Sequence, residues 1–186
     1  MGGRMPEHVN YPEKYQMRMT GGGKRPQGHA TAMRADKVSW EDVDRLRDIW
    51  PGKLIIKGIL DEGDARLAAN SGADALIVSN HGGRQLDGAV STIHALPGIV
   101  DAVGKDIEVW MDGGIRSGQD VLKAWALGAK GTLIGRSFLY GLGAMGEAGV
   151  TKCLEIIHKE LDVTMAFTGH RDIHNVTKDI LYPGTF

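Results

Sequence analysis

The chain has 186 residues, of which 42% are hydrophobic and 24% charged, and its formal net charge is −1. This composition is typical of one globular domain and includes no basic surplus for binding nucleic acid. No apolar run approaches the roughly 18 residues that a membrane span needs. A single cysteine, Cys153, excludes an internal disulfide framework and fits a reducing compartment, so we expect a cytoplasmic protein.

Residues 1–38 differ from the remainder of the chain. They contain five of the eight methionines and a run of three glycines, without a clear apolar period. Seven Lys or Arg residues against three Asp or Glu residues give this segment a charge of +4, so the remainder carries −5. We interpret it as a basic loop separate from a domain over residues 39–186. Peripheral contact with the inner face of a membrane through this loop is one option.

A regular pattern begins at Ser39, where Ser39-Trp-Glu-Asp42 has the form of a capping box for a helix that ends near Trp50. Four short apolar runs follow, each bounded by glycine: Leu54–Lys57, Ala75–Ser79, Ile107–Asp112 and Gly131–Gly135. Continuous apolarity predicts strands that are buried on both faces, as in parallel sheets.

Helical stretches alternate with these strands. We expect helices over residues 61–71, 92–103 and 117–127, and a long last helix with an apolar stripe from Val150 to Met165. Four consecutive βα units belong either to a doubly wound sheet or to a barrel. A complete eightfold barrel usually needs about 250 residues, so the prediction is an α/β fold that forms the C-terminal half of a (β/α)8 TIM barrel.

Function in such barrels gathers at the C-terminal ends of the strands. The third and fourth strands are followed by Asp112-Gly113-Gly114-Ile115-Arg116 and Gly135-Arg136. Glycines there let backbone N–H groups converge on an anion, and the next helix adds its dipole. Arginines at both loops can add charge-assisted hydrogen bonds to a phosphate. In the alternative interpretation, the glycines only turn the chain and the arginines are solvated. This alternative explains less well why both loops share the pattern.

The second strand is followed by His81-Gly82-Gly83-Arg84. A histidine can act as a general base near neutral pH, and an arginine three residues later can hold a carboxylate with two parallel hydrogen bonds. This pair suits a substrate whose reacting carbon adjoins a carboxylate. Lys57, at the end of the first strand, would place a cation in the barrel mouth to stabilise negative charge on a cofactor. Its structural alternative is a salt bridge, with Asp112 as one candidate partner.

The run Ser79–Asp87, SNHGGRQLD, resembles the active-site signature of the FMN-dependent L-2-hydroxy-acid oxidases and dehydrogenases, the family of glycolate oxidase, lactate dehydrogenase and mandelate dehydrogenase. The resemblance continues through KGIL, DGGIRSGQDVLKAWALGA and IGRSFLYGL and covers residues 38–182. It implies an FMN cofactor and the oxidation of a small L-2-hydroxy acid to a 2-keto acid. The proton could leave the substrate hydroxyl, with hydride transfer to the flavin, or it could leave the α-carbon, which forms a carbanion; both mechanisms stay open. The identity of the 2-hydroxy acid and of the electron acceptor also stays open.

The resemblance also implies a role for each matching residue. His81 would be the catalytic base and Arg84 would bind the substrate carboxylate, while Lys57 and Ser79 would contact the flavin ring. The ribityl chain and phosphate would be held by Asp112, Gly113, Gly114, Arg116, Gly135 and Arg136. No metal site is expected, and the Gly141–Gly146 run, although it has the spacing G-x-G-x-x-G, lacks the strand context of a dinucleotide fingerprint.

The family has about four further βα units before this region, which supply further active-site groups, including an aspartate that orients the histidine. We therefore expect the chain to associate with an N-terminal half-barrel or with its own copy, as an oligomer. The alternative function is a non-catalytic half-barrel that binds FMN or another phosphate and associates with a partner half.

Overall fold

The computed structural model of the protein describes residues 38–184, so nearly all of the predicted basic loop lies outside the described residues. Residues 43–184 belong to one compact unit. Its sheet has four parallel strands in the order β1-β2-β3-β4. The strands are β1 Ile55–Ile59, β2 Ala75–Val78, β3 Glu108–Asp112 and β4 Gly131–Leu133. The helices are α2 Trp40–Ile49, α3 Glu62–Asn70, α4 Thr92–Val103, α5 Gly118–Ala126 and α6 Arg136–Phe167, with 3₁₀ turns η2 His81–Gly83, η3 Ile173–Asn175 and η4 Lys178–Ile180.

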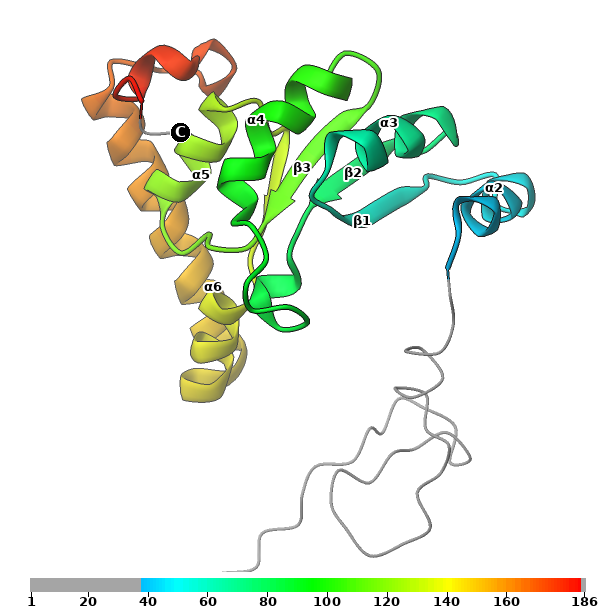
Figure 1. Ribbon diagram of the computed structural model, residues 1–186. Helices are drawn as coiled ribbons and strands as arrows, with labels where there is room; N and C mark the ends of the chain where they lie inside the picture. Colours follow the sequence, from blue (N-terminus) through cyan, green and yellow to red (C-terminus); the bar gives the residue numbers. More distant parts are fainter. Residues whose placement is uncertain (1–37, 185–186) are drawn as a thin grey trace, which may run out of the picture. The chain divides into compact units, whose positions relative to one another are not determined.

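The strands are sequential neighbours, and each is joined to the next through a helix, which confirms the four predicted βα units. Right-handed crossovers place such helices on one face of the sheet. Accordingly, α3 packs against β1 and β2, and α4 packs against β2 and β3 (Figure 1). Helix α5 contacts β4 and runs along α6. This is the arrangement of one portion of a TIM barrel, with the C-terminal ends of all four strands at the same edge.

Local signals in the sequence explain where the helices begin. Asp61 caps α3 by accepting from the backbone N–H groups of Gly63 and Asp64. Ser117 and Asp120 form the predicted capping box at the start of α5. The carboxylate of Asp42 accepts from the backbone N–H of Ser39 at the start of α2. All these predicted helices agree with the structure because caps and apolar periods are local properties.

The last helix differs from its prediction, because it begins at Arg136 rather than near Val150. A non-helical residue, Gly146 with φ 62° and ψ −139°, divides α6 into two segments. Gly141 of the first segment packs directly on Gly149 of the second, where an added Cβ would clash with the Gly141 carbonyl oxygen. The glycine run with dinucleotide-like spacing thus covers the first segment of α6 and its interruption at Gly146, and Gly141 allows the two segments to pack closely.

The prediction that every strand is buried on both faces holds for β2, all four residues of which are buried. In β3 only Val109 and Met111 are buried, and Ile55 in β1 is 40% exposed. The edge strands β1 and β4 lack one neighbour among residues 38–184, and burial on both faces is complete only in the central strand β2. The core therefore lies between the sheet and its helices, around Leu76, Leu96, Ile99, Met111 and Leu122.

The opposite ends of the strands carry a polar network around Asp74. Its carboxylate accepts from Lys53 Nζ at 2.6 Å and from the Leu54 backbone N–H at 2.9 Å, and it pairs with Arg47 at 3.3 Å. The hydrogen bonds from Lys53 and Leu54 hold the pKa of the Asp74 carboxyl below its usual value. This network joins the end of α2 to the loops that precede β1 and β2.

Candidate active site

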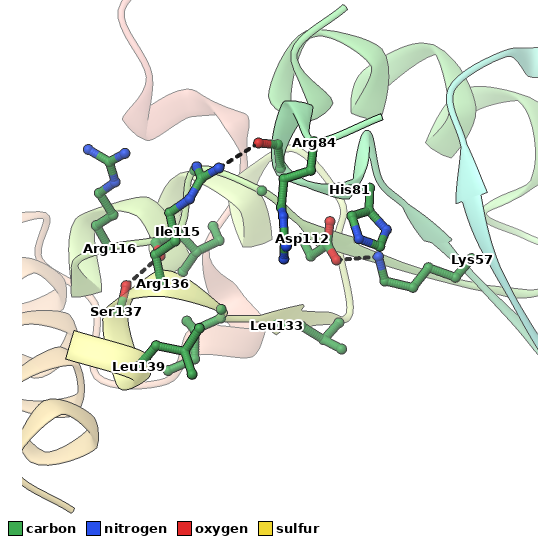
Figure 2. Close-up of a pocket in the computed structure, with 15 residues that line it drawn as sticks. Lys57, His81, Arg84, Asp112, Ile115, Arg116, Leu133, Arg136, Ser137 and Leu139 are labelled. Atoms are coloured by element: carbon green, nitrogen blue, oxygen red, sulfur yellow. Dashed lines mark hydrogen bonds and ion pairs between the residues drawn. The ribbon is translucent and has the colours of Figure 1, made fainter. Parts of the chain in front are cut away.

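Lys57, in β1, contacts the C-terminal ends of β2 and β3. Its Nζ lies 2.6 Å from Asp112 Oδ2 at the end of β3 (Figure 2). It also donates to Ser79 Oγ, which follows β2, at a distance of 2.6 Å. A register irregularity follows Lys57 at Gly58, which has φ 106°. Irregularities of this kind re-aim side chains at sheet edges near functional sites. The salt bridge considered as a structural alternative for Lys57 is therefore present, and it lies inside the candidate site.

The candidate base follows β2 in a short 3₁₀ turn, η2. His81 is exposed and has φ 56°, a left-handed conformation that no other non-glycine residue adopts within residues 38–184. Its backbone N–H donates to Ser79 Oγ at 3.1 Å. The next two backbone N–H groups, of Gly82 and Gly83, donate to Asn80 Oδ1. The turn is therefore fixed by two polar side chains that directly precede His81.

Glycines shape the turn after β3. Gly113 and Gly114 have φ values of 87° and 82°, which side-chain-bearing residues rarely adopt. A Cβ on Gly113 would lie 3.1 Å from Thr92 Oγ1, and Thr92 donates to the Gly113 carbonyl oxygen. At Gly114 the same position opens into free space. The backbone on this side of the turn is thus accessible to a ligand.

The fourth strand leads directly into α6, so Gly135, which was expected to end the strand, is the N-cap residue of that helix. It offers no side chain to the first-turn N–H groups, and the start of α6 lines the same cavity as the turn after β3. Ser137, in this first turn, donates to the Ile115 carbonyl oxygen at 3.1 Å. This bond ties the start of α6 to the loop that follows β3.

Two arginines lie on the side of the pocket away from Lys57 (Figure 2). Arg136 donates through Nη2 to the Gly82 carbonyl oxygen at 2.9 Å, so it touches the turn that carries His81. Arg116 is exposed, and its backbone N–H donates to Asp120 Oδ2. Cationic side chains therefore flank the glycine turns, as an anion site requires.

One cavity of about 470 Å³ brings these groups together. Nine of the ten predicted site residues line it: Lys57, His81, Arg84, Asp112, Gly113, Gly114, Arg116, Gly135 and Arg136. The exception, Ser79, is 2% exposed and lies behind the lining, where it accepts from Lys57 and His81. Its predicted contact with a flavin ring stays a prediction.

Sequence reasoning missed several residues of this site. The apolar wall of the cavity includes Ile115, Leu133, Ile134 and Leu139. The sequence had predicted only the neighbouring glycine and charged residues as site residues. Asn80 was also missed, although an Asn directly before His81-Gly82-Gly83 is a recognisable capping signal. Among residues 38–184 no group of three or more metal-ligating side chains is present. In the same part of the chain, no helix is both long and apolar enough to cross a membrane.

Comparison with known proteins identifies relatives over most of the chain. L-lactate dehydrogenase of Caulobacter vibrioides is 55% identical over 144 residues, which are 77% of this chain and 38% of that protein. L-lactate dehydrogenase of Pectobacterium atrosepticum is 54% identical over the same length and is covered to 37%. The chain thus spans less than two-fifths of the length of these curated relatives.

Solved structures lead to the same group. A crystal structure of mandelate oxidase with 3,3-difluoro-2-hydroxy-3-phenylpropionic acid superposes with a TM-score of 0.73 and 45% identity, over 76% of this chain and 43% of that one. The profile of the FMN-dependent dehydrogenases matches residues 4–183. The resemblance in the signature around His81 is therefore confirmed, and the chain belongs to the FMN-dependent dehydrogenase family.

Proposed function

We propose that this chain forms the part of an FMN-dependent oxidoreductase that holds the cofactor and oxidises an L-2-hydroxy acid to a 2-keto acid. The observation that carries the proposal is the single cavity in which a histidine, a lysine–aspartate pair and three arginines meet. Membership of a family defined by FMN dependence agrees with that chemistry.

The cavity residues fit FMN in three respects. A volume of about 470 Å³ lies within the range of about 300–1,000 Å³ that is typical of ligand pockets. Asp112 Oδ1 is buried and has no hydrogen-bond partner among residues 38–184, so it is an acceptor for a ribityl hydroxyl. Gly114, the start of α6 and Arg136 together provide donors for a phosphate.

The chemistry then divides among the chain's own residues. When bound, FMN supplies the acceptor for the two electrons that leave the substrate. His81 would take the proton released from the substrate, and Arg84 would hold the substrate carboxylate with two parallel hydrogen bonds. Lys57, held by Asp112, would stabilise negative charge that develops on the bound cofactor. Whether the hydroxyl or the α-carbon loses the proton to His81 is open in this proposal.

Anaerobic mixing tests the proposal directly. The chain is combined with an N-terminal half taken from a curated relative, loaded with FMN and mixed with L-lactate, glycolate or L-mandelate. We expect at least one of these acids to bleach the flavin absorbance in a single turnover. Retention of FMN without bleaching by any of them would favour the alternative, a half-barrel that binds a phosphate ligand without catalysis.

We propose further that four additional βα units complete the barrel, supplied by an N-terminal half in the same or a separate polypeptide. Both edge strands, β1 and β4, lack an outer neighbour among residues 38–184, and unpaired edges favour association. The 38% coverage of the relatives supports the same view. Association with a second copy is the rival arrangement. Native mass spectrometry distinguishes a second polypeptide species from a homo-oligomer.

A cytoplasmic location, with peripheral membrane contact through residues 1–38, is also a proposal. The support is the charge of +4 on this segment, which anionic lipids would attract. Co-sedimentation with phosphatidylserine vesicles at low and high salt is the test. Binding that is equal with and without residues 1–38 would argue against a role of the segment in membrane contact.

A further inference from the structure

The backbone of His81 needs support from its surroundings. Its φ of 56° places a residue with a Cβ in the left-handed region. This conformation is strained, and it persists only where neighbouring groups hold the backbone in place. Because the side chain is exposed at the pocket, packing around the imidazole does not supply that support. The groups that hold the turn around His81 therefore decide where the base lies.

Asn80 makes hydrogen bonds in two directions from its side-chain amide. Oδ1 accepts from the backbone N–H groups of Gly82 at 3.0 Å and Gly83 at 3.3 Å, so it caps the 3₁₀ turn through two consecutive N–H groups. Nδ2 donates to the Val90 carbonyl oxygen at 3.2 Å. One side chain thus ties the turn of the base to the far end of the loop that carries Arg84.

The same amide lies against the turn after β3. A Cβ on Gly113 would lie 3.4 Å from Asn80 Oδ1, so the two turns lie within van der Waals contact of each other. Asn80 therefore connects three segments of the site: the turn of the base, the exit of the Arg84 loop and the glycine turn beside Asp112.

From these contacts we infer that Asn80 is a positioning residue for His81. By capping the turn, it holds the imidazole toward the pocket in which Lys57 and Asp112 lie. The inference rests on the proposed function in one respect, namely that His81 is the base. It assigns to Asn80 no contact with substrate or cofactor, and Asn80 is absent from the residues that line the cavity.

Two other side chains contact this turn, but each holds a single atom. Ser79 Oγ accepts from the His81 N–H, and Arg136 donates to the Gly82 carbonyl oxygen. Arg136 is also the proposed phosphate ligand, so an FMN phosphate would compete for its guanidinium. Asn80 keeps its three backbone partners whether or not a phosphate engages Arg136, and it is therefore the side chain that maintains the turn in both cases.

Amide hydrogen exchange on the 186-residue chain tests the structural half of this inference without any substrate. In Asn80→Ala, the Gly82 amide should exchange about five- to tenfold faster, since it loses its acceptor. The Gly83 amide should change less, because it also donates to the Asn80 backbone carbonyl oxygen at 3.0 Å. Asn80→Asp keeps the acceptor oxygen and should keep both amides slow. Asn70→Ala, at the end of α3, is the matched control. Unchanged exchange at Gly82 in Asn80→Ala would overturn the inference.

Kinetics of the FMN-loaded complete enzyme test the functional half. A displacement of a catalytic group by about 1 Å costs on the order of 10²-fold in rate, so Asn80→Ala should slow flavin reduction at saturating substrate by about ten- to hundredfold. Rates are expressed per bound flavin, which removes any general loss of folded protein. Asn80→Asp should recover to within about threefold of the unchanged enzyme, because it still caps the turn.

The outcomes separate the two ideas. A reduction rate per bound flavin in Asn80→Ala that equals that of the unchanged enzyme would show that Asn80 does not position the base. If no 2-hydroxy acid reduces the flavin of the unchanged enzyme, the proposed function fails, and with it the assignment of His81 as base. The exchange experiment would still decide whether Asn80 holds the turn. If Asn80→Ala does not fold alone, the FMN-loaded complete enzyme, stabilised by its ligand, carries both measurements.

Discussion

The guanidinium of Arg136 donates to the backbone carbonyl oxygen of Gly82 at 2.9 Å, across 54 positions of sequence. The first of these residues begins α6 after the fourth strand, and the second lies in the turn that carries His81. The proposed phosphate site and the turn that carries the proposed base are therefore in direct contact, so a change at Arg136 should act on both.

Substitution of Arg136 should weaken FMN retention. Loss of a charged hydrogen-bond donor to a phosphate costs about 1.5–3 kcal/mol, so Arg136→Ala should raise the dissociation constant for FMN by about tenfold or more. Arg66→Ala is the control, because Arg66 is exposed and forms an i,i+4 pair with Glu62 on α3. Fluorescence titration of FMN measures both variants. Equal affinities in the two would remove Arg136 from the phosphate site.

Substitution of His81 should separate chemistry from cofactor binding. Loss of a general base typically slows the reaction by about 10²–10⁴-fold, so His81→Ala should show that loss in flavin reduction by substrate. Flavin content should stay unchanged, because the imidazole is not among the proposed phosphate or ribityl ligands. His94→Ala, in the first turn of α4, is the matched control. Stopped-flow reduction within about threefold of the unchanged enzyme would show that another group takes the proton.

The packing of α6 predicts opposite effects for two glycines of the same helix. A methyl group on Gly149 would clash with the Gly141 carbonyl oxygen, so Gly149→Ala should destabilise the chain by about 1–3 kcal/mol. Gly143 has open space at the same position and an ordinary helical backbone. Gly143→Ala should therefore stabilise the chain by about 0.5–1 kcal/mol through helix propensity. Urea unfolding gives both values, and a stable Gly149→Ala would contradict the close crossing of the two segments.

The network around Asp74 predicts a pH dependence of stability. The hydrogen bond from Lys53 lowers the pKa of this carboxyl in the folded chain below its ordinary value of 3.8. A group whose folded pKa is lowered contributes stability above its unfolded pKa and loses it as pH falls through the folded pKa. Asp74→Asn should therefore lower the urea midpoint at pH 7, and the difference from the unchanged chain should shrink as the pH falls below about 4.

Glu155→Gln, which removes one partner of an exposed pair with Lys152, is the control for this pH dependence. Such exposed pairs contribute little, so its midpoint should follow that of the unchanged chain at both pH values. If Asp74→Asn lowers the urea midpoint by the same amount at acid and neutral pH, the loss of stability comes from the changed hydrogen-bond geometry and not from the lost charge.

Several features of this protein follow from the sequence alone. The strands and the helices α2 to α5 lie within about two residues of their predicted positions, because caps and apolar periods are local signals. The predicted site also follows, since parallel strands with sequential order bring their C-terminal ends to one edge. The order of the βα units is therefore sufficient to predict that Lys57, His81, Asp112 and Arg136 lie near one another.

The tertiary structure alone decided which of these residues touch and how the chain crosses itself. The contacts of Lys57 with Asp112 and of Arg136 with Gly82 depend on strand register and on rotamers, which no local pattern encodes. The same holds for the burial of Ser79 behind the pocket and for the approach of Asn80 to Gly113. It also holds for the close packing of Gly141 on Gly149, because the two segments of α6 meet there only once the chain has turned at Gly146.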